Sequence, residues 1–260
     1  MKYENLTGAI IGAYYEVYNH TSRTYPEYIY ERAMIHELRS RGLPCTQQDE
    51  YKIFYKNCPV GIQRLDLFVV QEVVVENKVA DKLTKRHKAQ CISYLKTVNK
   101  PIGLLINFGS AEPNFHRLYF DFDKRPENVT HAHPEPDADW LYPDLACKIL
   151  GALYEVHHVL GAGFVHRIYA NACHYELKSR NFIVEPIKRV QVAYKDTVIG
   201  DIAFGHLLVE GKIMIFPVAI REVEDIHLDD LKTWMRWRNI QLGILANFDD
   251  VRLSPVFVRA

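Results

Sequence analysis

The chain has 260 residues, enough for one large or two small domains, and its 48% hydrophobic and 25% charged residues are ordinary values for a soluble globular protein. Lysine and arginine number 32, as do aspartate and glutamate, which excludes a global positive field that gathers polyanions but leaves room for a local basic patch. The five cysteines lack the spacing of a disulfide framework or a zinc site, and neither an apolar signal region nor an 18-residue apolar run occurs, so we expect a cytoplasmic protein without a membrane segment.

Two helices are predicted near the N-terminus. Apolar residues at helical spacing indicate a first helix over residues 7–20, with Thr7 as its N-cap. A second helix is predicted from Tyr25 to Arg41, with Gly42 as its C-terminal cap. Glu27 lies near the start of this second helix. Its carboxylate there complements the helix dipole, and this structural role competes with a functional one.

Residues 66–78 form the most informative stretch. Two β-branched apolar runs flank a polar pair, which predicts a β-hairpin. If the hairpin folds about Gln71, Asp66 and Glu76 face each other with Cβ atoms about 4.5–5.5 Å apart, and Lys78 shares the strand face of Glu76. Opposed carboxylates repel unless a cation lies between them, so a divalent metal ion beside Lys78 is one interpretation. A surface salt bridge among solvent-facing strand residues is the other.

The rest of the first half alternates between strands and a helix. Strands are predicted over Glu50–Tyr55 and Ile102–Phe108, and a helix over Lys82–Val98. Three side chains of that helix are spaced so that they share one stripe, namely His87, Gln90 and Tyr94. The order of elements is helix, helix, three strands, helix, strand. This order is typical of an α/β or α+β sandwich around a mixed sheet.

Residues 122–143 are polar, rich in proline and aperiodic, and we expect a linker there. His131 and His133 within it could bind a metal ion, but few other ligands are near in sequence. The linker would separate a first domain, residues 1–121, from a second domain, residues 144–260.

The second half of the chain repeats the first. With an offset of 139 early and 140 late, residues 11–17 return at 150–156, residues 36–41 at 175–180, and residues 103–108 at 243–248. Tyr55-Lys56 likewise returns as Tyr194-Lys195. A similarity this long and this well ordered predicts two tandem copies of one domain.

The two copies differ where the first is charged. In the second copy, His166 stands for Glu27, His206 for Asp66, Phe216 for Glu76, Val218 for Lys78 and Asp230 for Gln90, while His227 matches His87. The second copy keeps the sequence pattern of the fold and loses the charged residues of the hairpin face. The charged set is therefore separable from the fold, and a functional role is favoured over a fold-stabilising ionic cluster.

These residues resemble the GxxExxY family, a branch of the PD-(D/E)XK nuclease-like superfamily. The name motif is similar to Thr24–Tyr30, with Thr24 in place of glycine, and to Gly163–Tyr169, with His166 in place of glutamate. Further similar elements are Arg64–Leu67, Glu76–Lys78, His87–Tyr94 and Leu105–Gly109. The resemblance covers residues 5–121 and, more loosely, 144–258. It implies two tandem PD-(D/E)XK-like domains, each a central mixed β-sheet flanked by helices, the second a degenerate pseudo-nuclease copy.

The resemblance implies a nuclease that hydrolyses phosphodiester bonds in DNA or RNA with a divalent metal ion, at one site in the first copy. The residues it assigns to Mg²⁺ or Mn²⁺ are Asp66, Glu76 and Glu27. Lys78 would position or activate the attacking water, and Gln90 with Tyr94 would orient substrate or water. Packing beneath the sheet is the alternative for Tyr94 and His87.

Basic residues near this site, among them Lys82 and Lys85, could contact phosphates, although the exposed face of their helix would be charged in any case. The rival hypothesis is a non-catalytic scaffold that binds nucleic acid or protein and keeps a vestigial site, in line with the neutral net charge. Under the nuclease hypothesis the second copy would pack as an internal pseudo-dimer partner or hold substrate, and duplicated domains commonly inherit the interface of a homodimer.

Overall fold

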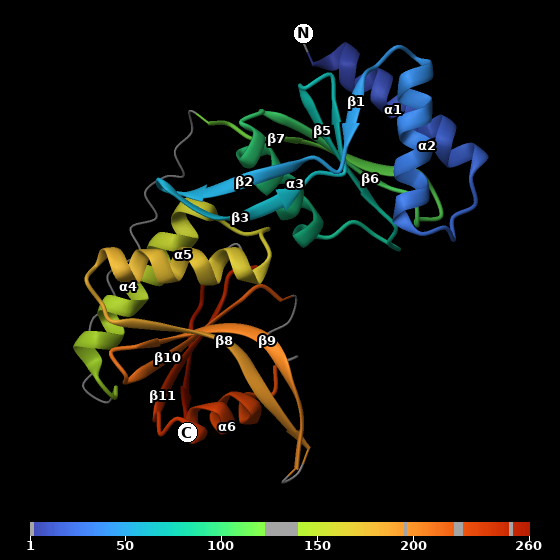
Figure 1. Ribbon diagram of the computed structural model, residues 1–260. Coiled ribbons are helices and arrows are strands. Elements are labelled where there is room, and N and C mark those ends of the chain that lie inside the picture. Colours follow the sequence, from blue (N-terminus) through green and yellow to red (C-terminus); the bar gives the residue numbers. More distant parts are fainter. Residues whose placement is uncertain (1–2, 123–139, 195–196, 221–225, 250–251) are drawn as a thin grey trace. The chain divides into compact units, whose positions relative to one another are not determined.

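The computed structural model describes residues 3–122, 140–194, 197–220, 226–249 and 252–260. By their contacts these residues form two compact units (Figure 1). The first unit holds the described residues up to Ile53 and from Ile62 to 122, and the second holds Phe54–Gly61 and the described residues from 140 onward. Within the described residues, no helix combines the length and the apolar character needed to cross a membrane.

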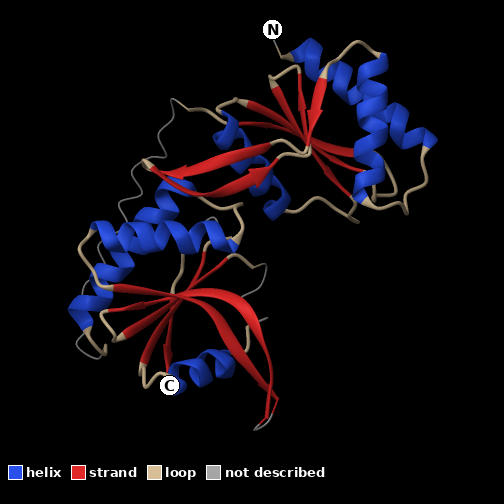
Figure 2. Cartoon of the chain, viewed as in Figure 1, coloured by secondary structure: helices blue, strands red, loops and turns tan. Residues whose placement is uncertain are grey.

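A five-stranded mixed sheet, with its strands drawn in red in Figure 2, forms the centre of the first unit. Its strand order is β1-β4-β5-β6-β7. Its strands are β1 (Cys45–Gln47), β4 (Leu67–Val69), β5 (Val73–Lys78), β6 (Ile102–Asn107) and β7 (Asn114–Tyr119). Strands β5 and β6 are parallel, and the other neighbours are antiparallel. Strand β6 is buried along its whole length, which explains its nearly continuous apolar sequence.

Helices cover both faces of this sheet. They are α1 (Glu4–His20), α2 (Glu27–Ser40) and α3 (Lys85–Val98). Helices α1 and α2 bury Tyr14, Tyr30 and Met34 in the core on one face. Helix α3 packs Tyr94 and Leu95 into a smaller cluster on the other face. The prediction of a mixed sheet flanked by helices is confirmed.

The predicted hairpin is present, and its register is confirmed. Leu67 pairs with Val75, so the ladder continued by one residue places Asp66 opposite Glu76. In the turn, Gln71 has a φ of 54°. Val70 also has a positive φ, of 53°, and Val69 pairs with Val73, so the loop spans residues 70–72 and is centred on Gln71.

Several predicted boundaries are wrong. Helix α1 begins at Glu4, and Thr7 lies inside it, where its hydroxyl donates to the Tyr3 carbonyl at 2.8 Å instead of capping the helix. Helix α3 begins at Lys85 because the Thr84 side chain caps it. Gly42 does follow the end of α2 with a φ of 73°, as predicted.

Strands β2 (Glu50–Tyr55) and β3 (Cys58–Arg64) form a separate two-stranded sheet. The first was predicted with these bounds. The second was missed because Pro59 and Gly61 interrupt its strand pattern. The tip of this hairpin, Phe54–Gly61, packs with the second unit.

The second unit repeats this architecture with the strand order β12-β11-β10-β9-β8. Its strands are β8 (Val184–Tyr194), β9 (Thr197–Val209), β10 (Ile213–Val218), β11 (Leu242–Asn247) and β12 (Val256–Arg259). Its helices are α4 (Pro143–Leu160), α5 (His166–Ser179) and α6 (Leu228–Trp237). The predicted linker, including His131 and His133, lies mostly outside the described residues.

The units also repeat single hydrogen bonds. Asn107 at the end of β6 accepts from the Ala80 amide at 3.0 Å and donates to its carbonyl at 2.7 Å. Asn247 at the end of β11 forms the same pair of bonds with Ile220, at 3.1 and 3.0 Å. The second half is therefore a folded copy of the first, as the internal repeat predicted.

Candidate metal centre in the first unit

Helix α2 and the β4–β5 hairpin bring acidic side chains to one end of the sheet. Glu27 is the first residue of α2, and Glu31 follows one turn later on the same helix face. Asp66 precedes β4 and lies across the ladder from Glu76 in β5. Glu27, Glu31 and Asp66 each offer a carboxylate oxygen, and these oxygens lie within 4.8 Å of one another.

Lys78 joins Glu76 to this group. Its Nζ atom lies 2.5 Å from Glu76 Oε1 and 3.6 Å from Glu27 Oε1. Glu76 is fully buried, its Oε1 atom pairs with the close ammonium, and no described residue hydrogen-bonds to its Oε2 atom. A buried carboxylate without hydrogen bonds costs free energy unless a cation compensates it. Oε2 is thus the Glu76 oxygen without a partner among the described residues.

The carboxylates resist ionisation when no ion is bound. Burial raises the pKa of Asp66 to about 6. Burial, together with the charge of Asp66, raises the pKa of Glu76 well above its usual value, and burial also raises the pKa of Glu27. Burial by itself lowers the pKa of Lys78, but the Glu76 carboxylate outweighs it and the pKa is raised overall. Such a site gains free energy when a divalent cation balances the negative charge.

Hydrogen bonds hold two of the acids in place. The Asn77 amide donates to Asp66 Oδ2 at 2.9 Å. The side chains of Gln47 and Gln48 both donate to Glu31 Oε2, at 3.0 and 2.8 Å. These bonds orient the carboxylates before any ion arrives, which is the usual task of residues around metal ligands.

Glu31 was missed by the sequence analysis. Two glutamates four residues apart on one helix repel each other, and that unfavourable pair was the available signal. With the offset of 139, Ala170 stands for Glu31 in the second half, so the internal repeat carried the same signal.

On α3, two predicted residues form a pair beneath the sheet. Gln90 Nε2 donates to the Tyr94 hydroxyl at 2.8 Å. Tyr94 is buried, and burial followed by the charge of Glu76 raises its pKa. The assignment of Gln90 and Tyr94 to the site stays a prediction.

His87 caps α3. Its Nδ1 atom accepts from the Thr84 amide at 3.3 Å, and its own amide donates to the Thr84 hydroxyl at 3.3 Å. This reciprocal arrangement is a capping box, a structural role in itself. Lys82 and Lys85 are exposed beside this end of the helix.

In the second unit, aromatic and histidine side chains occupy the positions that correspond to the acidic site of the first unit. His206 lies across the ladder from Phe216 in the register of the acid pair, with ring centroids 5.5 Å apart. Trp234 stacks on His206 at 6.3 Å, and the His166 Nδ1 atom lies 3.0 Å from a β10 carbonyl oxygen. Burial lowers the pKa of His206 to about 4, so its ring is neutral. The described residues of this unit contain no group of three acidic, histidine or cysteine ligands.

A family model described as the PD-(D/E)XK nuclease superfamily matches residues 4–118 and again residues 143–260. No curated protein and no solved structure matches the chain. The two matched regions cover most of the sequence and correspond to its two repeats, which confirms the tandem duplication.

Proposed function

The chain belongs to the PD-(D/E)XK nuclease superfamily, and from this premise we propose that its first repeat is a divalent-metal-dependent nuclease that hydrolyses phosphodiester bonds in DNA or RNA. One observation carries the proposal. Glu27, Asp66, Glu76 and Lys78 converge at one end of the first sheet, although they come from two distant segments. The second repeat keeps the fold without these residues, so the fold does not require them.

The residues present fit Mg²⁺ or Mn²⁺, because both ions prefer oxygen ligands. Glu27, Glu31 and Asp66 supply three neighbouring carboxylates, and Glu76 supplies its Oε2 atom, while its Oε1 atom pairs with Lys78. A bound ion of this kind lowers the pKa of water and neutralises charge that develops on a phosphate.

Lys78 supplies fixed positive charge to the site. Because its pKa is raised, its ammonium stays protonated at neutral pH and is unsuited to take a proton from water. It is suited to orient the attacking water and to stabilise negative charge on the phosphate. The Gln90–Tyr94 pair would orient substrate from the α3 side of the sheet.

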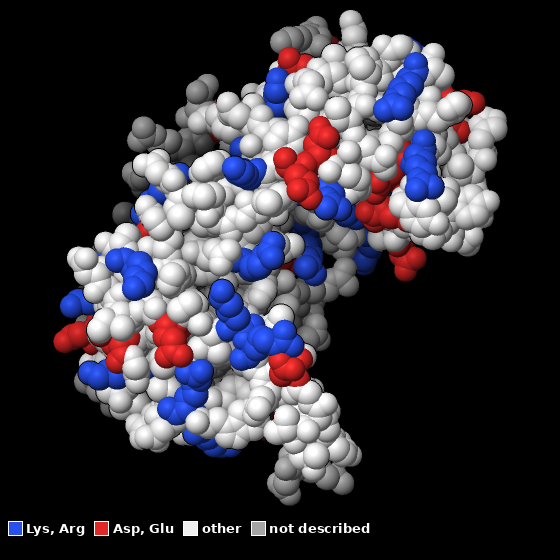
Figure 3. Space-filling view, viewed as in Figure 1, with Lys and Arg blue, Asp and Glu red and all other residues white. Residues whose placement is uncertain are grey.

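A few basic side chains near the site, and not a positive field over the whole molecule, would bind the phosphates of the proposed substrate. On the face shown in Figure 3, basic and acidic side chains are interspersed, as the balanced composition expects. Lys82 and Lys85 are exposed near the start of α3 and would contact phosphates, with His87 close in sequence. The five cysteines are free, which supports a reducing compartment such as the cytoplasm.

The second repeat would serve as a non-catalytic half of an internal pseudo-dimer. Its aromatic cluster occupies the place of the acids, and residues 54–61 of the first repeat pack with it. The same features support the rival function, a binding scaffold with a vestigial site.

A cleavage assay tests the proposal. The purified protein should cleave labelled DNA or RNA strands when Mg²⁺ or Mn²⁺ is present, and it should not cleave them when a chelator removes the metal ion. Asp66→Asn and Lys78→Met should each lower the rate about a hundredfold or more, because each removes charge aimed at the reacting phosphate. Glu112→Gln and Lys52→Met change exposed residues of the same charges and should leave the rate unchanged.

Metal-dependent cleavage that survives in Asp66→Asn would refute the assignment of the site. If the wild-type chain cleaves neither nucleic acid, calorimetric titration with Mn²⁺ decides what remains. Binding that is lost in Glu76→Gln would indicate a metal site in a scaffold, and no binding would indicate a vestigial one.

A further inference from the structure

The two repeats carry equivalent hairpins, β2–β3 and β8–β9. The first tip is Phe54–Gly61, and the second tip here means the described residues Tyr194 and Val198–Gly200 near the end of β8–β9. With the offset of 139, Tyr55, Val60 and Gly61 correspond to Tyr194, Ile199 and Gly200. The first tip is buried in the second unit, with Tyr55 0% and Val60 2% exposed. In the second tip, Tyr194 is 64% and Ile199 is 65% exposed. The equivalent side chains are thus buried in one repeat and largely exposed in the other.

Polar contacts fix the first tip on α5. The Tyr55 hydroxyl donates to Glu176 Oε2 at 2.9 Å, and Lys56 Nζ donates to the same oxygen at 2.7 Å. Arg180 donates to the other oxygen, Oε1, at 2.9 Å. Glu176 therefore uses one oxygen within its own helix and the other for the tip.

A close apolar contact accompanies these bonds. A Cβ atom added at Gly61 would lie 2.7 Å from Ile168 Cγ1, so the glycine allows β3 to approach that side chain. Asn171 Nδ2 donates to the neighbouring Val60 carbonyl at 2.7 Å. Ile168 is 1% exposed beneath the tip.

Helix α2 of the first unit carries the equivalent surface. Ile29 and Glu37 correspond to Ile168 and Glu176. Arg41 donates to Glu37 Oε1 at 2.6 Å, as the matching arginine does in α5. No described residue hydrogen-bonds to Glu37 Oε2, the oxygen that the tip uses in α5, and Ile29 is partly exposed.

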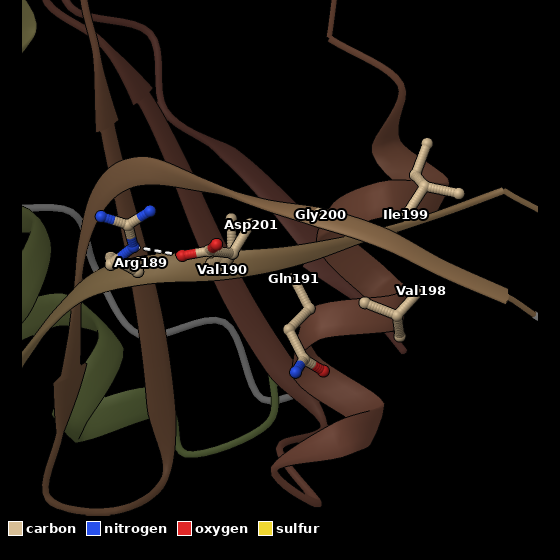
Figure 4. Close-up of a pocket in the computed structure, with 7 residues that line it drawn as sticks. All are labelled: Arg189, Val190, Gln191, Val198, Ile199, Gly200 and Asp201. Atoms are coloured by element: carbon tan, nitrogen blue, oxygen red, sulfur yellow. Dashed lines mark hydrogen bonds and ion pairs between the residues drawn. The ribbon is translucent and has the colours of Figure 1, made fainter.

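The second tip has a pocket at its glycine. Figure 4 shows this pocket on the β8–β9 hairpin, with Gly200, Ile199 and Val198 in its lining. An ion pair between Arg189 and Asp201 lies beside them. A Cβ atom at Gly200 would meet nothing within 4 Å. Glycine weakens the interior of a strand and often marks a place where another group approaches closely. In the first tip that group is the isoleucine of α5.

We propose that the β8–β9 tip of one chain docks on α2 of a second copy of the chain. Tyr194 would donate to Glu37 Oε2, and the Ile29 side chain would enter the pocket at Gly200. The partner is a second copy because its α2 offers the isoleucine and the glutamate that contact the first tip in α5, with the same arginine on the glutamate and Arg32 in place of Asn171. Each chain has one tip to give and one helix surface to receive it, so the contact joins copies into a closed ring or an open assembly.

Cysteine cross-linking tests the docking directly. In the first tip, a Cβ at Gly61 lies 3.9 Å from the Ile168 Cβ. This separation lies within the range of about 3.5–4.5 Å that disulfides span. A mixture of Gly200→Cys and Ile29→Cys proteins should therefore form a disulfide-linked heterodimer under mild oxidation. Either variant alone, and a mixture of Gly8→Cys with Ile29→Cys, should not, and these controls account for the five native cysteines.

Sedimentation of the unmodified chain supplies the second measurement. It should show a dimer or larger assembly, and Gly200→Val should weaken association about tenfold or more, since valine fills the pocket. The valine enters open space and suits a strand, so the fold is kept. Gly8→Ala, also in open space, should associate like the wild type. A monomer at all concentrations, or no heterodimer in the cysteine mixture, would overturn the proposal.

Discussion

Asp66 has a pKa of about 6 in the folded chain because burial disfavours its charged form, whereas its ordinary value is 3.8. Between these values the folded protein binds more protons than the unfolded chain. The free energy of unfolding therefore falls as the pH rises through this interval. The neutral acid is compatible with the fold, and the ionised acid needs a cation.

We predict that Asp66→Asn stabilises the metal-free protein in a pH-dependent way. The variant and the wild type should have similar free energies of unfolding near pH 4, and the variant should gain at most about 3 kcal/mol by pH 7. Denaturant unfolding in a chelator at several pH values measures the difference. Glu112→Gln, at an exposed carboxylate, should show no such trend. A gain that does not change with pH would show that the Asp66 pKa is not raised.

The start of α2, where Glu27 lies, depends on Tyr30. The Tyr30 hydroxyl accepts from the Tyr25 amide at 3.2 Å and donates to the Ser22 carbonyl. Its ring stacks on Phe108 at 4.4 Å. In the second unit, Tyr169 likewise accepts from an amide at 3.1 Å, donates to a carbonyl at 2.7 Å and stacks on a phenylalanine at 4.6 Å. A unit without the acids keeps the whole arrangement, so its role is structural.

Tyr30→Phe and Tyr169→Phe should therefore cost similar stability. Each removes a hydroxyl that satisfies two backbone groups, and each should lower the free energy of unfolding by about 1–3 kcal/mol. Chemical denaturation of both single variants and of the double variant gives the comparison. A normal stability in Tyr30→Phe together with lost metal-dependent cleavage would instead assign the tyrosine a direct catalytic role.

Much at this scale could be predicted from sequence because it depends on local pattern. Helical periodicity located α1 and α2, and alternation about Gln71 gave the register that pairs Asp66 with Glu76. Strand β1 escaped because three residues carry too little pattern. Glu31 escaped for a different reason: its partner Asp66 lies on another element, and no local pattern shows that this end of the helix meets the hairpin.

Over the whole molecule, duplication both preserved and altered the domain. The internal repeat located the acids by showing where the second copy had lost them. The aromatic cluster that took their place includes Trp234, which the comparison of charged positions did not reveal. The packing of the first hairpin tip in the second unit was also beyond prediction, because equivalent tips share a sequence pattern and differ in burial. Burial of this kind depends on which surface the tip meets.

That packing allows the first repeat to influence the stability of the second unit, and tryptophan fluorescence can report it. The three tryptophans, Trp140, Trp234 and Trp237, all lie in the second unit. Tyr55→Ala should lower the fluorescence-detected free energy of unfolding by about 3 kcal/mol, because it removes a buried ring and a hydrogen bond to Glu176.

Phe54→Ala is the matched control for this prediction. It deletes an aromatic ring next to Tyr55 on the same strand, but one that is 55% exposed. Its effect should stay within about 0.5 kcal/mol, the range of ordinary surface substitutions. If both variants shift the tryptophan signal equally, or if neither does, the tip does not belong to the cooperative core of the second unit. A loss confined to Tyr55→Ala would show that residues far apart in the duplicated sequence unfold together.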